Sequence, residues 1–294
     1  MLVTPATVAA RYRAEIRQEI RALATELKVV GFLAGDYGPS LTYAEYTRSA
    51  CADLGIVYEL RILPRLKLEQ GIRQANADPT VHGIMVYYPI FGNEQDRYLK
   101  DLVDYRKDIE GLGAYWIGKL YENERLVRGA EQSGKAVVPC TALAILKVLE
   151  ANGAYGASGT RPAEGKTVAI FNRSEVVGRP LAVMMSNDGA RVFSFDEQGP
   201  LLYRDGHAEE TEISRSEALR QSDLVITGVP SRSFPKIRLE ELPPHAICLN
   251  FATVKNFAPE VEEEAELFIP RVGPVTVAMC MRNTLRLHRT YGVR

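Results

Sequence analysis

The spacing of apolar residues in the first half of the chain predicts helices that alternate with strands. Residues 5–27 carry apolar side chains every third or fourth position, which predicts one long amphipathic helix. Short apolar runs predict strands at 29–35, 56–60 and 83–88. Helices are expected between them over about 40–54, with Ser40 as the N-cap, and over 66–76. This alternation favours a parallel sheet covered by helices.

The second half of the chain repeats the pattern. Apolar runs predict strands at 166–172, 191–196, 224–227 and 246–250. A helix is expected over 141–151, before a connector rich in Gly, Ser and Pro at 152–164. Residues 197–213 are polar and contain two turn dipeptides, which indicates a small hairpin inserted in the sheet. We therefore expect two α/β domains, 1–150 and 151–275.

Length and composition narrow the functional class. The 294 residues fit two domains, and 36 Lys and Arg against 37 Asp and Glu leave no basic excess. This balance argues against nucleic acid or an anionic membrane as a partner. No apolar run is long enough for a membrane span, and the start of the chain lacks a secretory signal. The widely spaced cysteines are typical of a reducing compartment, and the histidines show no ligand spacing. We expect a cytoplasmic protein without a metal site.

One stretch, residues 168–180, has the layout of a dinucleotide-binding strand, turn and helix. Asn172 takes the first tight-turn position and Gly178 lies at the helix start, although the usual GxGxxG is absent. Asp196 ends the next strand, where an acid accepts hydrogen bonds from the adenine ribose and repels a 2′-phosphate. These residues favour NAD as cofactor. An ordinary strand–loop–helix with a solvated Asp196 is the alternative.

A stronger signal is a set of seven short motifs spread over about residues 30–285. They are Leu33–Tyr43 (LAGDYGPSLTY), Asn76–Val86 (NADPTVHGIMV) followed by Pro89, Lys107–Gly111 (KDIEG), Pro139–Thr141 (PCT), Asn172–Pro180 (NRSEVVGRP), Ser222–Pro230 (SDLVITGVP) and Val272–Thr276 (VGPVT). In this order they resemble the methylenetetrahydrofolate dehydrogenase/cyclohydrolase family. Any one of the motifs alone is a weak signal, whereas seven in family order are a strong one.

The resemblance implies an architecture and a reaction. It implies a folate-side domain, 1–150, joined by a C-terminal helix at 276–294. It also implies a Rossmann-like NAD-binding domain at 151–275 with a mainly parallel sheet, and an active-site cleft between the two domains. Members of the family are typically homodimers. They oxidise 5,10-methylenetetrahydrofolate to 5,10-methenyltetrahydrofolate, within the one-carbon metabolism that supplies purine biosynthesis, and many then hydrolyse the product to 10-formyltetrahydrofolate.

Three positions depart from the pattern of the bifunctional members. Thr47 replaces a catalytic Lys, Tyr87 replaces a Gln, and Glu110 replaces the second Asp of a KDxDG motif. Hydride transfer needs no base, because the adjacent nitrogen lone pair stabilises the cation and alignment does most of the catalysis. Hydrolysis of the methenyl ring requires proton transfers that Thr47 cannot perform. We therefore predict a dehydrogenase with little or no cyclohydrolase activity, resembling the monofunctional NAD-dependent fungal branch.

The resemblance also assigns site residues. Catalytic positions are Tyr43, Thr47 and Glu110. Substrate-binding positions are Tyr43, Tyr87, Glu110, Pro274 and Thr276, with the Glu110 carboxylate accepting two adjacent pterin N–H donors. Cofactor-binding positions are Asn172, Arg173, Ser174, Gly178, Asp196, Gly228, Val229, Pro230 and Thr276.

Two other functions stay open. One is a bifunctional dehydrogenase/cyclohydrolase that uses NADP, since Arg173 and Ser174 are cationic and hydroxyl partners suited to a 2′-phosphate. The other is a catalytically silent protein that binds folate or nucleotide.

Overall fold

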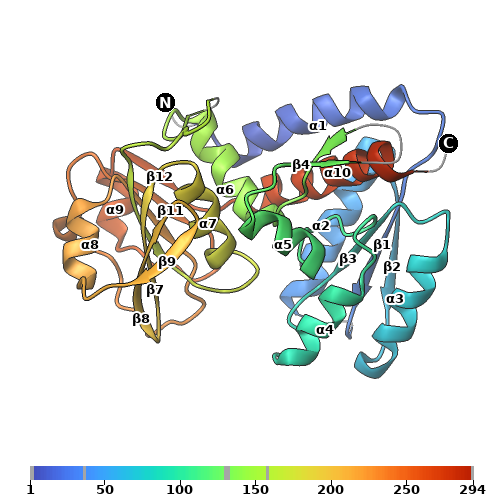
Figure 1. Ribbon diagram of the computed structural model, residues 1–294, viewed down its shortest axis with the longest axis horizontal. Helices are drawn as coiled ribbons and strands as arrows, with labels where there is room; N and C mark the ends of the chain where they lie inside the picture. Colours follow the sequence, from blue (N-terminus) through green and yellow to red (C-terminus); the bar gives the residue numbers. More distant parts are fainter. Residues whose placement is uncertain (1–2, 36–37, 129–132, 157–158, 293–294) are drawn as a thin grey trace. The chain divides into compact units, whose positions relative to one another are not determined.

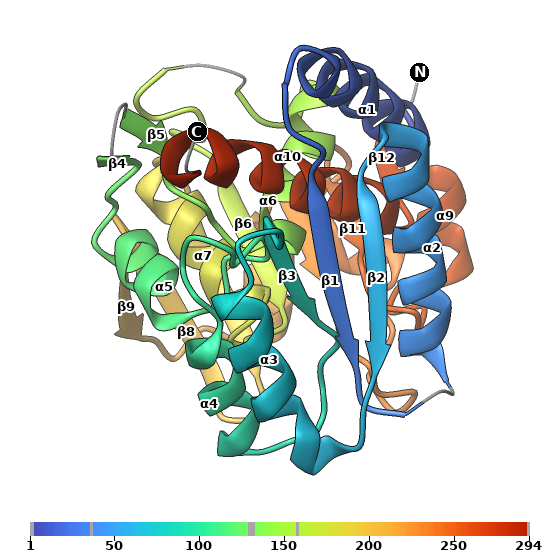
Figure 2. The same cartoon turned by 90° about the vertical axis from the view of Figure 1, so that its right-hand side faces the viewer.

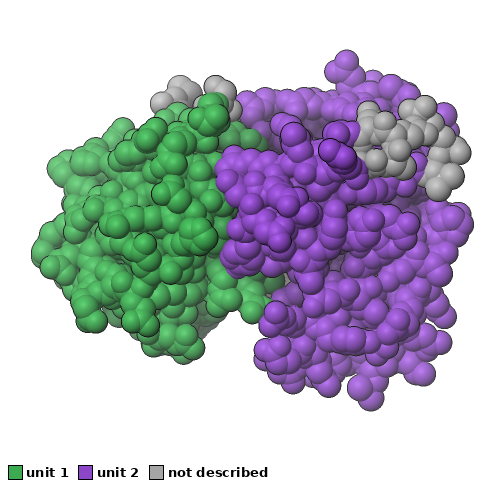
Figure 3. Space-filling view, in the orientation of Figure 1, with its two compact units in different colours: residues 1–8, 141–275 green, residues 9–140, 276–294 purple. Residues whose placement is uncertain are grey.

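The computed structural model describes residues 3–35, 38–128, 133–156 and 159–292. Asp36 and Tyr37 of the first motif and residues 157–158 of the predicted connector lie outside this part. The chain divides into two compact units, drawn in two colours in Figure 3. Unit 1 comprises residues 1–8 and 141–275, and unit 2 comprises residues 9–140 and 276–294. The chain therefore passes from one unit to the other inside helices α1 (Pro5–Arg21), α6 (Cys140–Ala151) and α10 (Gly273–Tyr291).

Unit 2 is built on a parallel sheet with the strand order β2–β1–β3. Its strands are β1 (Lys28–Leu33), β2 (Val57–Ile62) and β3 (Gly83–Val86), and Figure 2 shows their arrows pointing the same way. Its other elements are α2 (Pro39–Leu54), the 3-10 helix η1 (Arg65–Lys67), α3 (Leu68–Ala77), α4 (Glu94–Leu102), α5 (Ala114–Tyr121) and the antiparallel pair β4 (Leu126–Arg128) and β5 (Ser133–Lys135). The parallel order brings the carboxyl ends of the strands to one edge of the sheet.

Two details of the predicted helices in unit 2 were wrong. The first helix ends at Arg21 and not near residue 27, because Leu27 is fully buried and its carbonyl already accepts the backbone N–H of Val57 beside the sheet. The N-cap of α2 is Gly38 and not Ser40. Pro39 occupies the first turn, where its fixed φ suits a helix start. Ser40 is therefore a residue of the first helical turn and not the N-cap.

Unit 1 contains a larger, mainly parallel sheet with the order β12–β11–β10–β6–β7–β8–β9. Its strands β7, β8, β9, β11 and β12 are labelled in Figure 1. The parallel strands are β6 (Thr167–Phe171), β7 (Arg191–Asp196), β10 (Leu224–Thr227), β11 (Ile247–Asn250) and β12 (Leu267–Ile269). The connecting helices are α7 (Gly178–Asn187), α8 (Arg215–Gln221), the 3-10 helix η2 (Leu239–Glu241) and α9 (Pro259–Glu264). The mixed α/β class and the mainly parallel C-terminal sheet are confirmed. Strand order reverses between β6 and β10, which is where α/β sheets bind ligands.

The predicted hairpin at 197–213 is present as β8 (Gly199–Arg204) and β9 (His207–Glu210). Strand β8 pairs antiparallel with β7, and β9 pairs antiparallel with β8, so the hairpin extends the sheet beyond β7. Asp205 and Gly206 form its turn, both with positive φ.

Apolar residues of unit 1 form a core on the sheet. One cluster joins β6, β10 and β11 to α8 and α9, and contains Ala169, Phe171, Leu219, Val225, Cys248, Phe257 and Val261 among others. The four cysteines are buried free thiols. No helix in the described ranges is long and apolar enough to cross a membrane.

Candidate active site

The KDIEG motif places one carboxylate at the carboxyl end of β3. Asp108 forms a parallel bridge with Ile84, and the backbone N–H of Ile84 donates to the carbonyl of Lys107 at 2.8 Å. The segment therefore runs parallel to β3 at this one residue pair. Two residues further on, the Glu110 carboxylate accepts the backbone N–H of Val86 at 2.9 Å.

Lys107 and Asp108, the other charged residues of this motif, form hydrogen bonds with the backbone of neighbouring segments. Lys107 donates to the carbonyls of Ala75, Asn76 and Asp78 at the end of α3, where a cation also suits the helix dipole. The buried Asp108 accepts the backbone N–H groups of Gly111 and Gly113 at 2.9 and 2.8 Å. Glu110 is therefore the charged side chain of the motif that remains available to a ligand.

Burial changes the protonation of Glu110. The pKa of this carboxyl is raised to about 8: loss of hydration is the largest cause and the nearby Asp108 adds to it, while the Val86 N–H and Lys100 act in the opposite direction. In the free protein the group is therefore largely neutral at pH 7. Donors that approach the carboxylate favour its ionised form.

A cluster of hydroxyl groups lies beside Glu110. Tyr43 and Thr47 are one turn apart on α2, and the Thr47 hydroxyl donates to the Tyr43 carbonyl at 2.9 Å. The ring of Tyr43 meets that of Tyr87 edge-on, with centroids 5.9 Å apart. The hydroxyls of Tyr87 and Tyr58 lie 2.6 Å apart, and the side chain of Thr47 also hydrogen-bonds with Tyr87. We call Tyr43, Thr47, Tyr58 and Tyr87 the hydroxyl cluster.

The hydroxyl cluster offers no base near neutral pH. Burial raises the pKa of Tyr43, Tyr58 and Tyr87 well above the ordinary value, and the Glu110 charge raises each further. Thr47 is completely buried and does not titrate. These groups can therefore shape the site and hydrogen-bond within it, but they do not ionise near pH 7.

In unit 1, Asn172 organises the turn between β6 and α7. Its Nδ2 donates to the carbonyl of Gly228 after β10 at 2.8 Å, which joins the ends of the two strands. Its Oδ1 accepts the backbone N–H of Ser174 at 3.0 Å, the Ser174 hydroxyl at 2.7 Å and the backbone N–H of Gly178 at 3.1 Å. One side chain thus holds the turn at the point where strand order reverses.

Two glycines allow this turn to close. A Cβ atom on Gly178 would lie 1.9 Å from the carbonyl oxygen of Asn172, and one on Gly228 would lie 1.9 Å from the ring of Phe251. The first contact is with backbone and cannot be relieved by rotating a side chain. Helix α7 therefore starts close against the end of β6, so the positive end of its dipole lies at this edge of the sheet.

Asp196 ends β7 and is paired with Arg173 from the turn. Nη1 of Arg173 donates to Oδ1 of Asp196 at 2.9 Å. Nη2 of the same guanidinium donates to the carbonyls of Ser194 and Gly199. The prediction placed both residues at the cofactor, and the structure brings them into direct contact.

Two sequence models of one family match this chain. The model for the catalytic domain of tetrahydrofolate dehydrogenase/cyclohydrolase matches residues 3–110, and the model for the NAD(P)-binding domain matches residues 139–249. The chain belongs to the tetrahydrofolate dehydrogenase/cyclohydrolase family. The resemblance predicted from the motifs is confirmed.

Three relatives of 37–42% identity are named as NAD-dependent methylenetetrahydrofolate dehydrogenases. A methylenetetrahydrofolate dehydrogenase [NAD(+)] of Dictyostelium discoideum is 41% identical over 97% of this chain and 92% of its own length. The enzyme of the same name from Saccharomyces cerevisiae is 42% identical over 89% of this chain and 86% of its own length. The solved structure of the NAD-dependent 5,10-methylenetetrahydrofolate dehydrogenase from S. cerevisiae has a TM-score of 0.91 and 38% identity, covering 98% of this chain and 97% of that one.

The residues that the family resemblance assigned fall into two groups. Tyr43, Thr47, Tyr87 and Glu110 come together in unit 2. Asn172, Arg173, Ser174, Gly178, Asp196 and Gly228 come together in unit 1. Pro274 and Thr276 lie in the first turn of α10, on opposite sides of the division between the units.

Sequence reasoning missed two residues that support these groups. Tyr58 is the second residue of β2, where it looks like an ordinary strand residue, and its hydroxyl contacts Tyr87. Asn256 is almost fully buried and exchanges two hydrogen bonds with the backbone of Val229, at 2.9 and 3.0 Å, beside the exposed Pro230. Gly31 on the neighbouring strand β1 was a possible signal, because a Cβ there would meet the Tyr58 hydroxyl at 2.1 Å.

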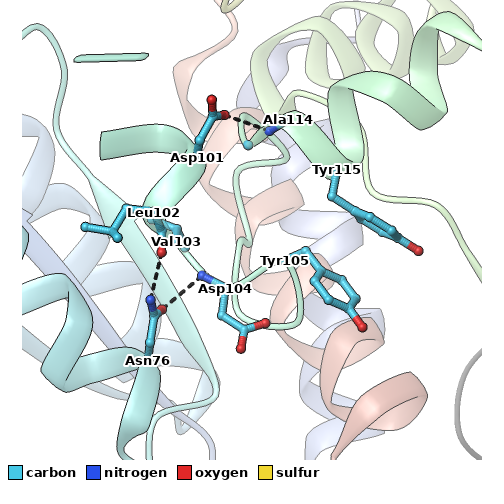
Figure 4. A pocket seen from close by; sticks show the side chains of 9 residues that line it. Asn76, Asp101, Leu102, Val103, Asp104, Tyr105, Ala114 and Tyr115 are labelled. Atoms are coloured by element: carbon cyan, nitrogen blue, oxygen red, sulfur yellow. Dashed lines mark hydrogen bonds between the residues drawn. The ribbon is translucent and has the colours of Figure 1, made fainter. Parts of the chain in front are cut away.

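A separate cavity of about 370 Å³ in unit 2 is lined by none of these residues (Figure 4). There Asn76 donates to the carbonyl of Leu102 and accepts the backbone N–H of Asp104. Asp101 accepts the N–H of Ala114 at the start of α5. These polar groups connect α3, α4 and α5, so we assign the cavity to the packing of the helices.

Proposed function

We propose that this protein oxidises 5,10-methylenetetrahydrofolate to 5,10-methenyltetrahydrofolate with NAD, and that it has little or no cyclohydrolase activity. The names and coverage of the NAD-dependent relatives support the first part. The observation that carries the proposal is Glu110, a carboxylate held at the carboxyl end of β3 and available to a ligand beside the hydroxyl cluster.

Glu110 is suited to the pterin end of the substrate. The pterin presents a ring N–H and an amino group side by side, and a carboxylate can accept one hydrogen bond on each oxygen. The Val86 N–H already orients the side chain. Binding the two donors would draw the Glu110 proton off, since both hydrogen bonds favour the ionised form. Tyr43 and Tyr87 would pack against the substrate beside it.

NAD would be held by the Asn172 turn. The pyrophosphate would lie at the N-terminus of α7, with Ser174 nearby, and Asp196 would accept hydrogen bonds from the adenine ribose. Gly228, Val229 and Pro230 would lie beside the nicotinamide half, with Asn256 fixing the backbone of Val229. Bound NAD supplies the hydride acceptor. We assign Pro274 and Thr276 to the substrate side, with Thr276 also reaching the cofactor.

The hydroxyl cluster accounts for the missing second reaction. Hydride loss needs no proton transfer, because the neighbouring nitrogen lone pair stabilises the cation, so the residues only need to orient the reactants. Hydrolysis of the methenyl ring requires a group that takes and returns protons near pH 7. Thr47 cannot titrate, and the tyrosine hydroxyls have raised pKa values.

A second function, the bifunctional enzyme, has one observation in its favour. The pKa of Glu110 is about 8, so this group can exchange a proton in the neutral range. If Glu110 served as a base for hydrolysis, it would have to do so while holding the pterin. We favour the monofunctional enzyme, because the proposed pterin contacts occupy both carboxylate oxygens.

The experiment that tests the dehydrogenase is a comparison of initial rates with 5,10-methylenetetrahydrofolate and either NAD or NADP at matched concentration. We expect reduction with a strong preference for NAD. Reduction of neither cofactor would overturn the proposal and favour the silent binding protein. Preference for NADP would retain the enzyme and overturn the role of Asp196.

We extend the proposal to the setting of the enzyme on the family resemblance and, for its location, on the spacing of the cysteines. It would be a cytoplasmic homodimer of one-carbon metabolism that contributes to purine biosynthesis, with a folate-side domain of residues 1–150 and 276–294 and an NAD-binding domain of residues 151–275. Sedimentation equilibrium tests the dimer, and fractionation of the source cells tests the location.

A further inference from the structure

Arg173 makes an unusually complete set of contacts within unit 1. Besides its bond to Asp196, its guanidinium donates to the hydroxyl and the carbonyl of Ser194, at 3.4 and 2.6 Å, and to the carbonyl of Gly199. Only 6% of its side chain is exposed. Most of its N–H donors are therefore used inside the protein, and the guanidinium joins the end of β7 to the start of β8.

The partner carboxylate is held by one oxygen and offers the other. Oδ1 of Asp196 accepts Nη1 of Arg173 and the backbone N–H of Gln198 at 2.8 Å. No hydrogen bond within the described residues reaches Oδ2, and 29% of the Asp196 side chain is exposed. Arg173 and the Gln198 N–H thus orient the Asp196 carboxylate through Oδ1, and Oδ2 is left for a ligand.

We infer that Arg173 is a positioning residue for cofactor selection, which acts through Asp196 instead of binding the cofactor itself. The inference rests on the proposed use of NAD. A free arginine at this turn would attract the 2′-phosphate of NADP, because guanidinium and phosphate form strong paired hydrogen bonds. Here the guanidinium charge is neutralised by Asp196 and most of its donors are used, so the ribose meets a fixed carboxylate.

The inserted hairpin takes part in this arrangement. Gly199 begins β8 opposite Asp196 in the antiparallel register, and its carbonyl is one of the acceptors of Arg173. Its φ of 104° lies in a region that residues with a side chain rarely adopt. The turn from β7 into β8 thus fixes both the Asp196 carboxylate and the Arg173 guanidinium.

A double-mutant cycle tests the inference on the full-length enzyme. We would measure KM and kcat for NAD and NADP, and NADH affinity by fluorescence, in R173Q, D196N and the double variant. We expect R173Q to raise the KM for NAD about 10- to 100-fold, the range for a lost charged hydrogen bond, with kcat changed less than about twofold. In the D196N background, R173Q should add no further loss of NAD affinity.

Two more variants sharpen the test. R173K should recover part of the NAD affinity, because an ammonium can pair with Asp196 but cannot also reach the carbonyls on both strands. D196N alone should raise the ratio of NADP to NAD use at least about tenfold, since it leaves the Arg173 charge unpaired. R191Q is the matched control. Arg191 lies on β7, the strand that ends at Asp196, but it pairs with Gln221. We expect the KM values of R191Q for NAD and NADP to match those of the wild type.

The outcomes separate the alternatives. If R173Q leaves the KM for NAD unchanged and abolishes residual NADP use, Arg173 contacts the cofactor directly and the inference fails. If R173Q weakens NADH binding equally in both backgrounds while lowering Tm, Arg173 only stabilises the hairpin and the inference also fails. A wild-type protein that binds NADH but does not oxidise the folate would overturn the proposed function, whereas the binding cycle would still decide the role of Arg173.

Discussion

The two candidate sites differ in how their polar groups are paired. In the turn after β6 in unit 1, the Asn172 side chain hydrogen-bonds to Ser174, Gly178 and Gly228, and none of these bonds involves a titrating side chain. The site in unit 2 keeps Glu110 available, with a pKa near neutrality, among hydroxyls that do not titrate. In the proposed function, backbone shape would hold NAD at the first site, and the protonation of Glu110 would govern folate binding at the second.

This difference predicts different sensitivities to substitution. A closed turn fails when backbone atoms can no longer approach, whatever the charge of the new residue. A site with one titrating carboxylate keeps its shape when that group is changed, but it loses affinity and its dependence on pH. Substitutions in the two regions can therefore break the comparison or sharpen it.

The largest effect is expected for Gly178→Ala. The new methyl group would meet the Asn172 carbonyl at 1.9 Å, so the turn must open. We expect NAD affinity to fall more than about 100-fold, the scale of overpacking of about 3 kcal/mol. Isothermal titration with NADH measures the loss. Gly118→Ala on α5, where a Cβ has open space, is the control and should leave NADH binding unchanged. Equal NADH affinity in Gly178→Ala would contradict the closed turn.

The next effect is expected for Glu110→Gln, which keeps the shape and removes the ionisable group. The amide cannot accept both pterin donors, so the KM for the folate should rise about 10- to 100-fold. In the wild type, the folate KM should fall as pH rises toward about 8, because the ionised carboxylate is the accepting form. Steady-state kinetics from pH 6 to pH 9 measure both effects. If the folate KM of Glu110→Gln depends on pH as the wild-type KM does, the titrating group is not Glu110.

Stability should also depend on Glu110. Its pKa is raised on folding, so its proton stabilises the folded state below the unfolded value near 4.5, and this contribution is lost as pH rises through about 8. We expect about 1–3 kcal/mol from this group, allowing for partial exposure. The measurement is the Tm of the wild type and of Glu110→Gln at pH 5 and pH 9. Glu110→Gln should flatten the fall in Tm, and an identical fall in both would refute the assignment.

The smallest effect is expected for Tyr58→Phe. It removes the hydroxyl that contacts Tyr87 at 2.6 Å but leaves the ring packed against Gly31. The folate KM should rise about threefold to tenfold, the effect of one neutral hydrogen bond of ~1 kcal/mol, while NADH affinity stays the same. Tyr98→Phe on α4, which removes another tyrosine hydroxyl of unit 2 that bonds to Glu69, is the matched control. A larger loss for Tyr98→Phe would contradict a special role for Tyr58.

The same contrast explains what the sequence could predict. The strand and helix around Asn172 are neighbours in sequence, so their period and turn residues predicted both elements and a turn between them, but not the hydrogen bonds by which Asn172 closes that turn. The contact of Tyr58 with Tyr87 depends on strands β2 and β3 flanking β1, and no local pattern encodes that pairing. The link from Arg173 to Gly199 depends likewise on the register of an inserted hairpin.

Charged motifs show the same limit on a smaller scale. Lys107, Asp108 and Glu110 look alike as a charged loop in the sequence. The structure engages Lys107 with the end of α3 and Asp108 with the following turn, and leaves only Glu110 for a ligand. Family resemblance marked the whole motif, but distinguishing the roles of its members required the hydrogen bonds.

The most direct test of the account is a single progress curve with 5,10-methylenetetrahydrofolate and NAD, in which NADH and methenyltetrahydrofolate are followed together by absorbance. The account predicts equal amounts of both products, with the methenyl compound decaying only at the rate measured in buffer without enzyme. Decay that accelerates with enzyme concentration would show cyclohydrolase activity. It would contradict the claim that a site with Thr47 and Tyr87 cannot hydrolyse the methenyl ring.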